Sequence, residues 1–391
     1  MAEKGLKNIV ILGAGVAGIR AALDLVKKVD KSTGRIILVD ENDYHQYLYK
    51  IQEVCNREYE EKNIIVPISR LIRGKRIEFI KTSVKNVSIE RQVVETTSEE
   101  IPFDILVIAL GSHVAYFGIE GLEENSTTLS SFEMAKKIRS RITELFNEAE
   151  RTGTPPNIVV GGGGFTGVEL AGEIADWYPI LCEEHSIQKP EKYVSIVEMM
   201  PTILPGWNEK LVLKGQEVLE NIGVQLVLDD AVMKVSEGKI ELKSGRTLTP
   251  DLFIWNGGVR GDPACGSEFE IKGRRITIDE YCRVEGHENI YVAGDSACAT
   301  NAEGRPLPPT AHIAMVHGDL VARNIASSLR GEPLTPYVHK HIGEIVTLGR
   351  TYAIGDLFGI QFKGTLAKFM KKVVHWWYLY SIGGVSLVFG S

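Results

Sequence analysis

The sequence has few cysteines, and no two of them form a C-x-x-C pair. The five cysteines, Cys55, Cys182, Cys265, Cys282 and Cys298, are odd in number and far apart. Secreted disulfide frameworks, zinc ribbons and thioredoxin-type redox sites all need paired or closely spaced cysteines. The sequence therefore indicates free thiols in a reducing compartment, and it predicts no metal site.

Positive charge and long apolar runs are also scarce. The 391 residues include 44 Lys and Arg against 51 Asp and Glu, a formal net charge of -7. Nucleic acid binds to basic surfaces, so the negative net charge excludes it as a main partner. No uncharged apolar run reaches the roughly 20 residues that span a bilayer, and the N-terminus lacks the pattern of a secretory leader. We expect a cytoplasmic chain whose membrane contact is peripheral.

A pattern of strand, glycine-rich loop and helix occurs twice in the chain. Each loop follows the spacing G-x-G-x-x-G and consists of Gly13, Gly15 and Gly18 in the first copy and of Gly162, Gly164 and Gly167 in the second. Each unit then continues into a further strand-like run that ends in an acid, Asp40 or Glu198. One such loop is a weak signal, whereas two complete units are a strong one. The sequence predicts an α/β fold with two Rossmann-like dinucleotide-binding domains.

The residue types of this pattern suit a dinucleotide. Its pyrophosphate needs backbone N–H donors and a helix N-terminus, which the glycines bring close to the ligand. Asp40 lies 22 residues beyond Gly18, where a carboxylate can bind a ribose diol. Glu198 lies 31 residues beyond Gly167, and we attribute this longer spacing to an insertion at 179–193 after the helix. No arginine follows Glu198 to pair with a 2′-phosphate, so NADH is favoured over NADPH.

Two further motifs resemble those of the two-dinucleotide-binding pyridine nucleotide–flavin oxidoreductases. The strand-like run 103–109 with Gly111 resembles the motif that returns the chain from the first domain of that family. The run 290–293 with Asp295 resembles the late flavin motif, whose aspartate contacts the ribityl chain. The resemblance implies FAD in the first domain and NADH in the second. Beyond the glycine loops and their acids, the contacts it implies are Ala109, Gly111, Asp295 and Ala311 for FAD, and Gly258 for NADH.

Within that family the chain resembles the type II NADH dehydrogenases, single-subunit NADH:quinone oxidoreductases, over almost its whole length. The matching motifs are Asp43-Tyr44-His45, residues 164–173, 254–261, 308–311 and 379–384. The resemblance implies that NADH transfers a hydride to FAD, and that two electrons then pass to a quinone. It also implies that Glu169, within the second of these motifs, lies near nicotinamide and flavin and acts in catalysis.

The expected quinone motif departs from the family pattern. Where the family has Ala-Gln-x-Ala-x-Gln, His312 and Val316 here stand at the glutamine positions. A histidine can bind a quinone carbonyl and supply a proton, so we expect His312 to be catalytic and His312, Val316 and Lys363 to line the quinone site. The departure leaves other functions open: a soluble NADH oxidase or ferredoxin-reductase-type flavoprotein, a relative of sulfide:quinone oxidoreductase, or an NADH-sensing flavoprotein without turnover. Sulfide oxidation needs a pair of cysteines near the flavin, for which the sequence gives no convincing candidates.

The C-terminal segment contains an amphipathic helical pattern. Its apolar face consists of Leu366, Phe369, Met370, Val373, Val374 and Trp377, and its polar face of Lys368, Lys371, Lys372 and His375. This pattern suits a helix that lies in a membrane interface; the alternatives are packing on the protein's own core or on a second copy in a homodimer. We expect a peripheral protein on the cytoplasmic face of the cell membrane.

These patterns also predict how the chain is divided. The FAD domain is expected to be discontinuous, formed by residues 1–115 and 262–330, with the NADH domain of residues 116–261 inserted between the two parts. Residues 331–391 are expected to form a short C-terminal element that faces a membrane or a partner.

Overall fold

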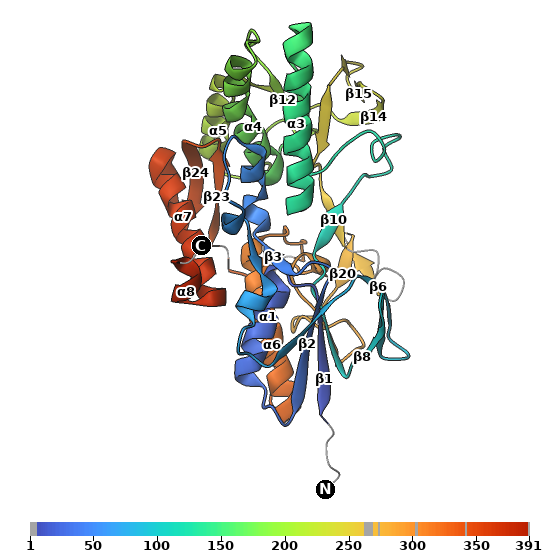
Figure 1. Cartoon of the computed structure of the whole chain (residues 1–391). Helices are drawn as coiled ribbons and strands as arrows, with labels where there is room; N and C mark the ends of the chain where they lie inside the picture. The colour runs from blue at the N-terminus through green and yellow to red at the C-terminus, as the bar shows by residue number, and fades with distance from the viewer. Residues whose placement is uncertain (1–5, 262–268, 273, 302–303, 341, 390–391) are drawn as a thin grey trace.

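The computed structural model describes residues 6–261, 269–272, 274–301, 304–340 and 342–389. Cys265 and residue 262, where the second FAD segment was expected to begin, lie outside the described residues. The rest forms two lobes, one above the other, with the C-terminal segment along one side (Figure 1).

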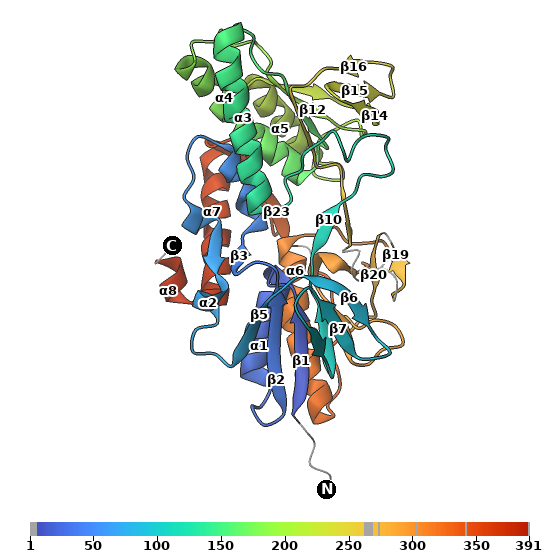
Figure 2. The same ribbon diagram turned by 45° about the vertical axis from the view of Figure 1, so that its right-hand side comes forward.

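The lower lobe is built on a parallel sheet in the order β21-β9-β1-β2-β5. Its strands are β1 (Lys7–Leu12), β2 (Gly34–Asp40), β5 (Ile77–Lys81), β9 (Ile105–Ile108) and β21 (Ile290–Val292). The inner strands are apolar on both faces, as expected for a sheet covered on both sides. Helices α1 (Val16–Lys28) and α6 (Ala311–Arg330) lie side by side against it (Figure 2).

The upper lobe repeats this arrangement with a parallel sheet in the order β13-β12-β11-β17. Its elements are β11 (Ile158–Gly161), β12 (Val194–Val197), β13 (Val224–Val227), β17 (Leu252–Trp255), α3 (Phe132–Thr152), α4 (Phe165–Glu184) and α5 (Glu209–Asn221). Two Rossmann-like sheets in one chain confirm the predicted fold class.

The expected insertion at 179–193 is partly wrong. Helix α4 continues through Pro179 and ends only at Glu184, because its last turns bury Leu181 and Cys182 in the core of the upper lobe. Only the residues after Glu184 form the connection to β12. Packing of the apolar face thus outweighs the usual tendency of proline to end a helix.

The chain passes between the lobes through a pair of short strands. β10 (Ser112–Val114) leads up, β18 (Val259–Gly261) leads back, and the two pair antiparallel. Smaller elements surround the sheets: β3 (Tyr44–Gln46), η1 (Leu48–Cys55), η2 (Glu61–Asn63), β4 (Ile65–Pro67), α2 (Ile68–Leu71), β6 (Val84–Ser88), β7 (Val93–Thr96), β8 (Glu100–Pro102), β14 (Val232–Ser236), β15 (Lys239–Leu242), β16 (Thr247–Leu248), β19 (Ile271–Lys272), β20 (Arg275–Thr277), η4 (Gly294–Ser296) and β22 (Ala297–Cys298).

The C-terminal segment contains more than the predicted helix. A three-stranded antiparallel sheet comes first, formed by β23 (Gly343–Leu348), β24 (Tyr352–Leu357) and β25 (Ile360–Lys363). Helices α7 (Gly364–Gly383) and α8 (Val385–Val388) follow. β23 packs on α4 of the upper lobe, while α7 packs on β24 and also contacts α1 of the lower lobe (Figure 1). This segment therefore contacts both lobes at their junction.

Candidate active site

The first glycine loop is shaped by close backbone approaches. Gly13 has a φ of 94°, and a Cβ there would lie 2.3 Å from the Ala109 carbonyl oxygen. A Cβ at Gly18 would lie 1.8 Å from the carbonyl oxygen of Gly13. Gly15, the N-cap of α1, is different, because a Cβ there would meet no atom within 4 Å. Its open side faces away from the protein at a helix N-terminus, which fits a pyrophosphate.

The second glycine loop has the same geometry. Gly162 has a φ of 102°, and a Cβ there would lie 2.6 Å from the carbonyl oxygen of Asn256, which follows β17. A Cβ at Gly167 would lie 1.9 Å from the Gly162 carbonyl oxygen, and one at Gly164 would meet nothing within 4 Å. Gly258, with a φ of 154°, leaves room for the Phe117 ring. In both lobes the loop lies where strand order reverses, the usual dinucleotide position in such sheets.

The two predicted acids hold these loops in matching ways. The amide of Ala14, between the first two glycines, donates to Asp40 Oδ2 at 2.6 Å. The amide of Gly163 donates to Glu198 Oε2, also at 2.6 Å. In each case the other carboxylate oxygen accepts from the amide two residues further on. A carboxylate has about four lone-pair sites, so both acids can still accept from a ribose diol.

The remaining flavin motifs converge beside the first loop. The Ser112 hydroxyl donates to Asp295 Oδ2 at 3.4 Å, and the Ser296 hydroxyl donates to the Gly111 carbonyl oxygen at 2.9 Å. A Cβ at Gly294 would lie 3.1 Å from Ala17 Cβ on α1 and 3.4 Å from Cβ of Ala314 on α6. Burial raises the pKa of Asp295, and the Arg275 guanidinium partly opposes this. Residues from five separate stretches of sequence thus form one site.

The start of α6 carries the predicted acceptor residues. Ala311 is its first residue, and Thr310 caps it by accepting from the Ile313 amide at 3.3 Å. His312 and Val316 are one turn apart, and each is partly exposed. Lys363 is exposed at the end of β25, where it precedes α7. The proposed roles of these three residues stay predictions.

His317, on the same helix, is a site residue that the sequence pattern did not predict. This residue is fully buried, and its Nδ1 accepts from the Gly294 amide at 3.3 Å. Burial lowers the pKa of His317 to about 4, so the ring is neutral. The only feature of the sequence that could have indicated a role for His317 is its position directly after the quinone motif. It positions the turn that carries Asp295.

Glu169 lies at the junction of four elements. It is buried on α4, and its Oε1 accepts from both the amide and the hydroxyl of Thr347 on β23 at 2.8 Å. Its Oε2 accepts from Gln52 of η1 at 3.2 Å, and the ammonium of Lys371 on α7 forms an ion pair with it. The lysine that reaches this site is Lys371, which the sequence pattern predicted only as part of a polar helix face.

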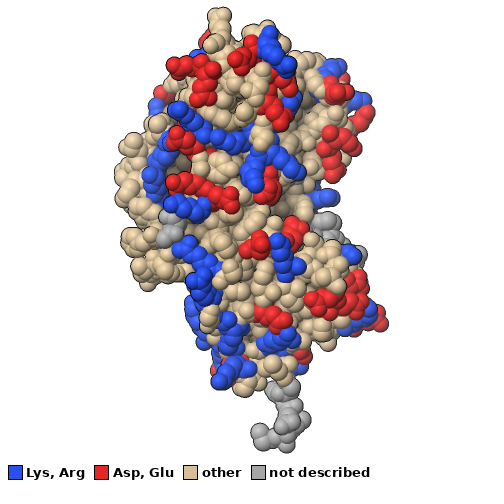
Figure 3. Space-filling view, viewed as in Figure 1, with Lys and Arg blue, Asp and Glu red and all other residues tan. Residues whose placement is uncertain are grey.

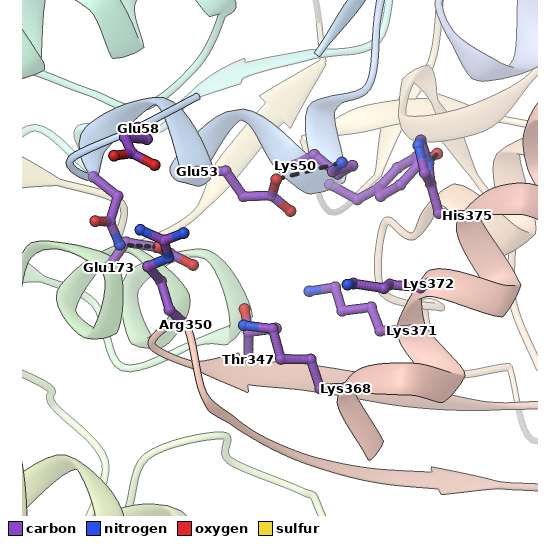
Figure 4. A pocket seen from close by; sticks show the side chains of 12 residues that line it. Lys50, Glu53, Glu58, Glu173, Thr347, Arg350, Lys368, Lys371, Lys372 and His375 are labelled. Carbon is purple, nitrogen blue, oxygen red and sulfur yellow. Dashed lines mark hydrogen bonds and ion pairs between the residues drawn. The ribbon is translucent and has the colours of Figure 1, made fainter. Parts of the chain in front are cut away.

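A cavity of about 210 Å³ lies next to this cluster. Figure 4 shows lysines of α7 extending into it toward Glu53 on η1. Glu173, one turn beyond Glu169 on α4, also lines it and accepts from Asn56 at 2.5 Å. Burial raises the pKa of Glu173 to about 7, with the Asn56 hydrogen bond opposing the rise. The full lining is Tyr49, Lys50, Glu53, Asn56, Glu58, Glu173, Thr347, Arg350, Lys368, Lys371, Lys372 and His375.

His45 connects the first glycine loop to α7. Its Nδ1 lies 2.7 Å from the Ala14 carbonyl oxygen, and its Nε2 lies 2.8 Å from the Tyr378 hydroxyl. A carbonyl oxygen only accepts, so Nδ1 carries the proton and Nε2 accepts from Tyr378. Burial lowers the pKa of His45 to about 4, which keeps the ring neutral. Through His45, the Asp43-Tyr44-His45 motif links the first glycine loop to α7.

Two Rossmann-like sheets, each with a glycine loop and its acid, define an oxidoreductase that binds two dinucleotides. Consistently, the family model for pyridine nucleotide-disulphide oxidoreductases matches residues 7–318. A protein of Staphylococcus aureus strain NCTC 8325 named type II NADH:quinone oxidoreductase is 31% identical over 392 residues, which cover 98% of each chain. The chain belongs to the pyridine nucleotide-disulphide oxidoreductases and, within them, to the type II NADH:quinone oxidoreductase family. The predicted family is confirmed.

Solved structures show the same fold. NDH2 from Plasmodium falciparum in complex with NADH superposes with a TM-score of 0.85 at 17% identity, covering 98% of this chain and 96% of that one. The sulfide:quinone oxidoreductase of Aquifex aeolicus superposes with a TM-score of 0.79 at 19% identity, covering 96% and 91%. At such identities the likeness shows the fold alone.

Proposed function

We propose that this chain oxidises NADH with bound FAD and passes two electrons to a quinone. The observation that carries the proposal is the pair of matched loop-and-acid sites in a member of the type II NADH:quinone oxidoreductase family. When bound, FAD supplies the ring that accepts the hydride and releases the electrons. The protein binds and orients the two nucleotides.

The experiment is an anaerobic titration of the purified, FAD-loaded protein. NADH should bleach the visible flavin spectrum, and a short-chain quinone added afterwards should restore it. NADH without quinone under air is the control for an oxidase. Bleaching by NADH that no quinone reverses would refute quinone reduction, and turnover with oxygen alone would favour the oxidase alternative.

We assign FAD to the lower lobe, residues 1–115 and 262–330, and NADH to residues 116–261. The convergence of Gly111, Asp295 and the start of α6 beside the first loop supports this assignment. Glu198, with two methionines after it and no arginine, supports NADH over NADPH.

For the acceptor side we propose His312, Val316 and Lys363, with Glu169 near the nicotinamide. His312 and Val316 share one face of α6 in the turns that adjoin the Asp295 site, which supports their place beside the flavin. A histidine at this position can donate to a quinone carbonyl. Glu169 contacts η1, β23 and α7 near the junction of the lobes, which supports a place near the nicotinamide.

The sulfide:quinone alternative is disfavoured by the thiols that the structure describes. Cys55, Cys182, Cys282 and Cys298 are all buried and unpaired. Burial raises the pKa of the Cys55 and Cys282 thiols, which suppresses the thiolate form that thiol redox chemistry needs. Free buried thiols also support a reducing compartment, and we place the protein on the cytoplasmic side.

We also propose that α7 and α8 rest on a membrane. Helix α7 is amphipathic, but its lysine face turns inward to the cavity while its apolar face is exposed. The exposed apolar residues are Leu366, Phe369, Val374, Trp376, Trp377, Tyr380, Val385 and Phe389. The side of the molecule formed by α7 and α8 is largely free of charged side chains (Figure 3). An apolar patch with aromatic residues suits a bilayer interface.

Cations beside this patch fit anionic lipid headgroups. Arg70 on α2 donates to the Ser386 carbonyl oxygen of α8 at 2.9 Å, and Arg73 and Lys75 follow it, exposed. Among the described residues no helix is long and apolar enough to cross a membrane. We propose attachment to one leaflet, on the cytoplasmic face.

Flotation with vesicles that contain an anionic lipid tests this attachment. Trp377→Glu, at a site 55% exposed, should reduce binding, whereas Leu213→Glu on α5, at a site 58% exposed, should not. Sedimentation of the free protein tests the homodimer. If the wild type is a dimer that Trp377→Glu dissociates while vesicle binding is absent, the apolar face is a subunit interface and the membrane proposal fails.

A further inference from the structure

The proposed reaction needs one proton from water in every turnover. NADH gives up a hydride, which carries two electrons and one proton, and becomes NAD⁺. A quinone takes up two electrons and two protons to become a quinol. The balanced reaction is NADH + H⁺ + quinone → NAD⁺ + quinol, so one proton must pass from solvent to the site of quinone reduction.

We propose that the cavity bounded by η1, α4, β23 and α7 is this route, with Glu173 as the group that relays the proton toward Glu169. This inference rests on the proposed function. It concerns residues that neither glycine loop nor the quinone motif includes.

The cavity connects Glu173 to the Glu169 cluster. Thr347 and Lys371 line the cavity, and both of them bind Glu169 directly. Glu173 follows Glu169 by one turn on the same helix, and it lines the same cavity. A cavity of about 210 Å³ has room for several water molecules. Water in a polar cavity can hydrogen-bond from one of these groups to the next.

The charged groups around Glu173 suit repeated proton transfer. Lys368 of α7 favours the charged form of Glu173, whereas Glu53 of η1 and Asp176 of α4 disfavour it. Arg350 also lines the cavity (Figure 4). Burial raises the pKa of the Glu173 carboxyl to about 7, and the hydrogen bond from Asn56 partly opposes the rise. A relay group works best when its pKa is close to the working pH.

The test separates the two half-reactions in stopped-flow. Glu173→Gln should slow reoxidation of the NADH-reduced flavin by a short-chain quinone about a hundredfold, the lower end of the typical contribution of a proton-transfer group. Reduction of the flavin by NADH should stay within about twofold, since hydride transfer needs no proton from water. The pH dependence of reoxidation near neutrality should disappear, and Glu173→Asp should retain part of it.

A spectroscopic measurement provides a readout apart from turnover. Infrared spectra of the oxidised, FAD-loaded protein should show a protonated carboxyl band that titrates near neutral pH and is absent in Glu173→Gln. Glu184→Gln, an exposed site at the end of the same helix, is the matched control and should change neither measurement. Equal slowing of both half-reactions, or an unchanged pH profile, would overturn the relay. If the wild type shows the band but no quinone reoxidises its flavin, the proposed function fails, and with it the route to quinone.

Discussion

Replacing Glu173 by Gln should make the protein more stable at neutral and alkaline pH. Gln is neutral and similar in size, and its side-chain oxygen can still accept from Asn56, as Glu173 does at 2.5 Å. The folded protein raises the pKa of Glu173 from 4.5 to about 7, mainly because burial disfavours the charged form. At high pH the wild type therefore carries a buried charge that the variant lacks.

The sign and size follow from proton linkage. Between pH 4.5 and about 7 the folded protein holds a proton on Glu173 that the unfolded chain has lost. The wild-type free energy of unfolding therefore falls as the pH rises through this window and is flat above it. Each pH unit corresponds to about 1.4 kcal/mol, so the total is about 3 kcal/mol. Glu173→Gln should match the wild type near pH 4.5 and exceed its free energy of unfolding by about 3 kcal/mol at pH 8.

The assay is urea unfolding at a series of pH values with FAD in fixed excess, followed by tryptophan fluorescence. At each pH, the free energy of unfolding of the variant is compared with that of the wild type. Only this difference is used, because two lobes need not unfold in one step. Glu184→Gln, on the exposed end of α4, should give a difference that does not depend on pH. The reasoning would be refuted if the difference in free energy of unfolding between Glu173→Gln and the wild type stayed constant from pH 5 to 8. It would also be refuted if the variant were less stable than the wild type at pH 8.

Three further outcomes can be checked directly. Gly15→Val should fold, because a Cβ at Gly15 meets no protein atom within 4 Å, yet it should purify without FAD, and an FAD content equal to wild type would contradict this. Glu198→Ala should weaken NADH binding by about 1–3 kcal/mol, seen as a higher KM with turnover little changed; a wild type that prefers NADPH would contradict the assignment. His312→Ala should slow reoxidation by quinone but not reduction by NADH in stopped-flow, and His312→Gln should keep quinone activity. Equal slowing of both steps would show that His312 only supports the flavin site.

The sequence predicted the two Rossmann-like units well because their signals are local. The turn at Gly13 needs a positive φ and a close approach to Ala109, and the acid must reach the amide inside the loop, so the residue types are tightly constrained. Glycines and acids at such positions can be read from sequence spacing alone. The small β23–β25 sheet was missed because no glycine loop or other motif marks its strands. What stabilises them is packing against α4 and α7, which a local pattern does not reveal.

The Glu169 cluster could be predicted only in part, since its members come from distant segments. Gln52, Thr347 and Lys371 belong to η1, β23 and α7, and no spacing rule connects them to α4. The sequence did show the two faces of α7, but it could not say which face turns inward. In a water-soluble helix the apolar face would be expected to pack on the core.

The proposed function explains why α7 turns its lysine face inward and its apolar face outward. Lys371 neutralises Glu169, and Lys368 faces Glu173, so the buried carboxylates need cations from the element that covers them. A helix that turns its cations inward must expose its apolar residues. In water this exposure is unfavourable, whereas at a bilayer surface it drives attachment. The same helix can therefore complete a charged cavity beside the site and attach the protein to the membrane that holds the quinone.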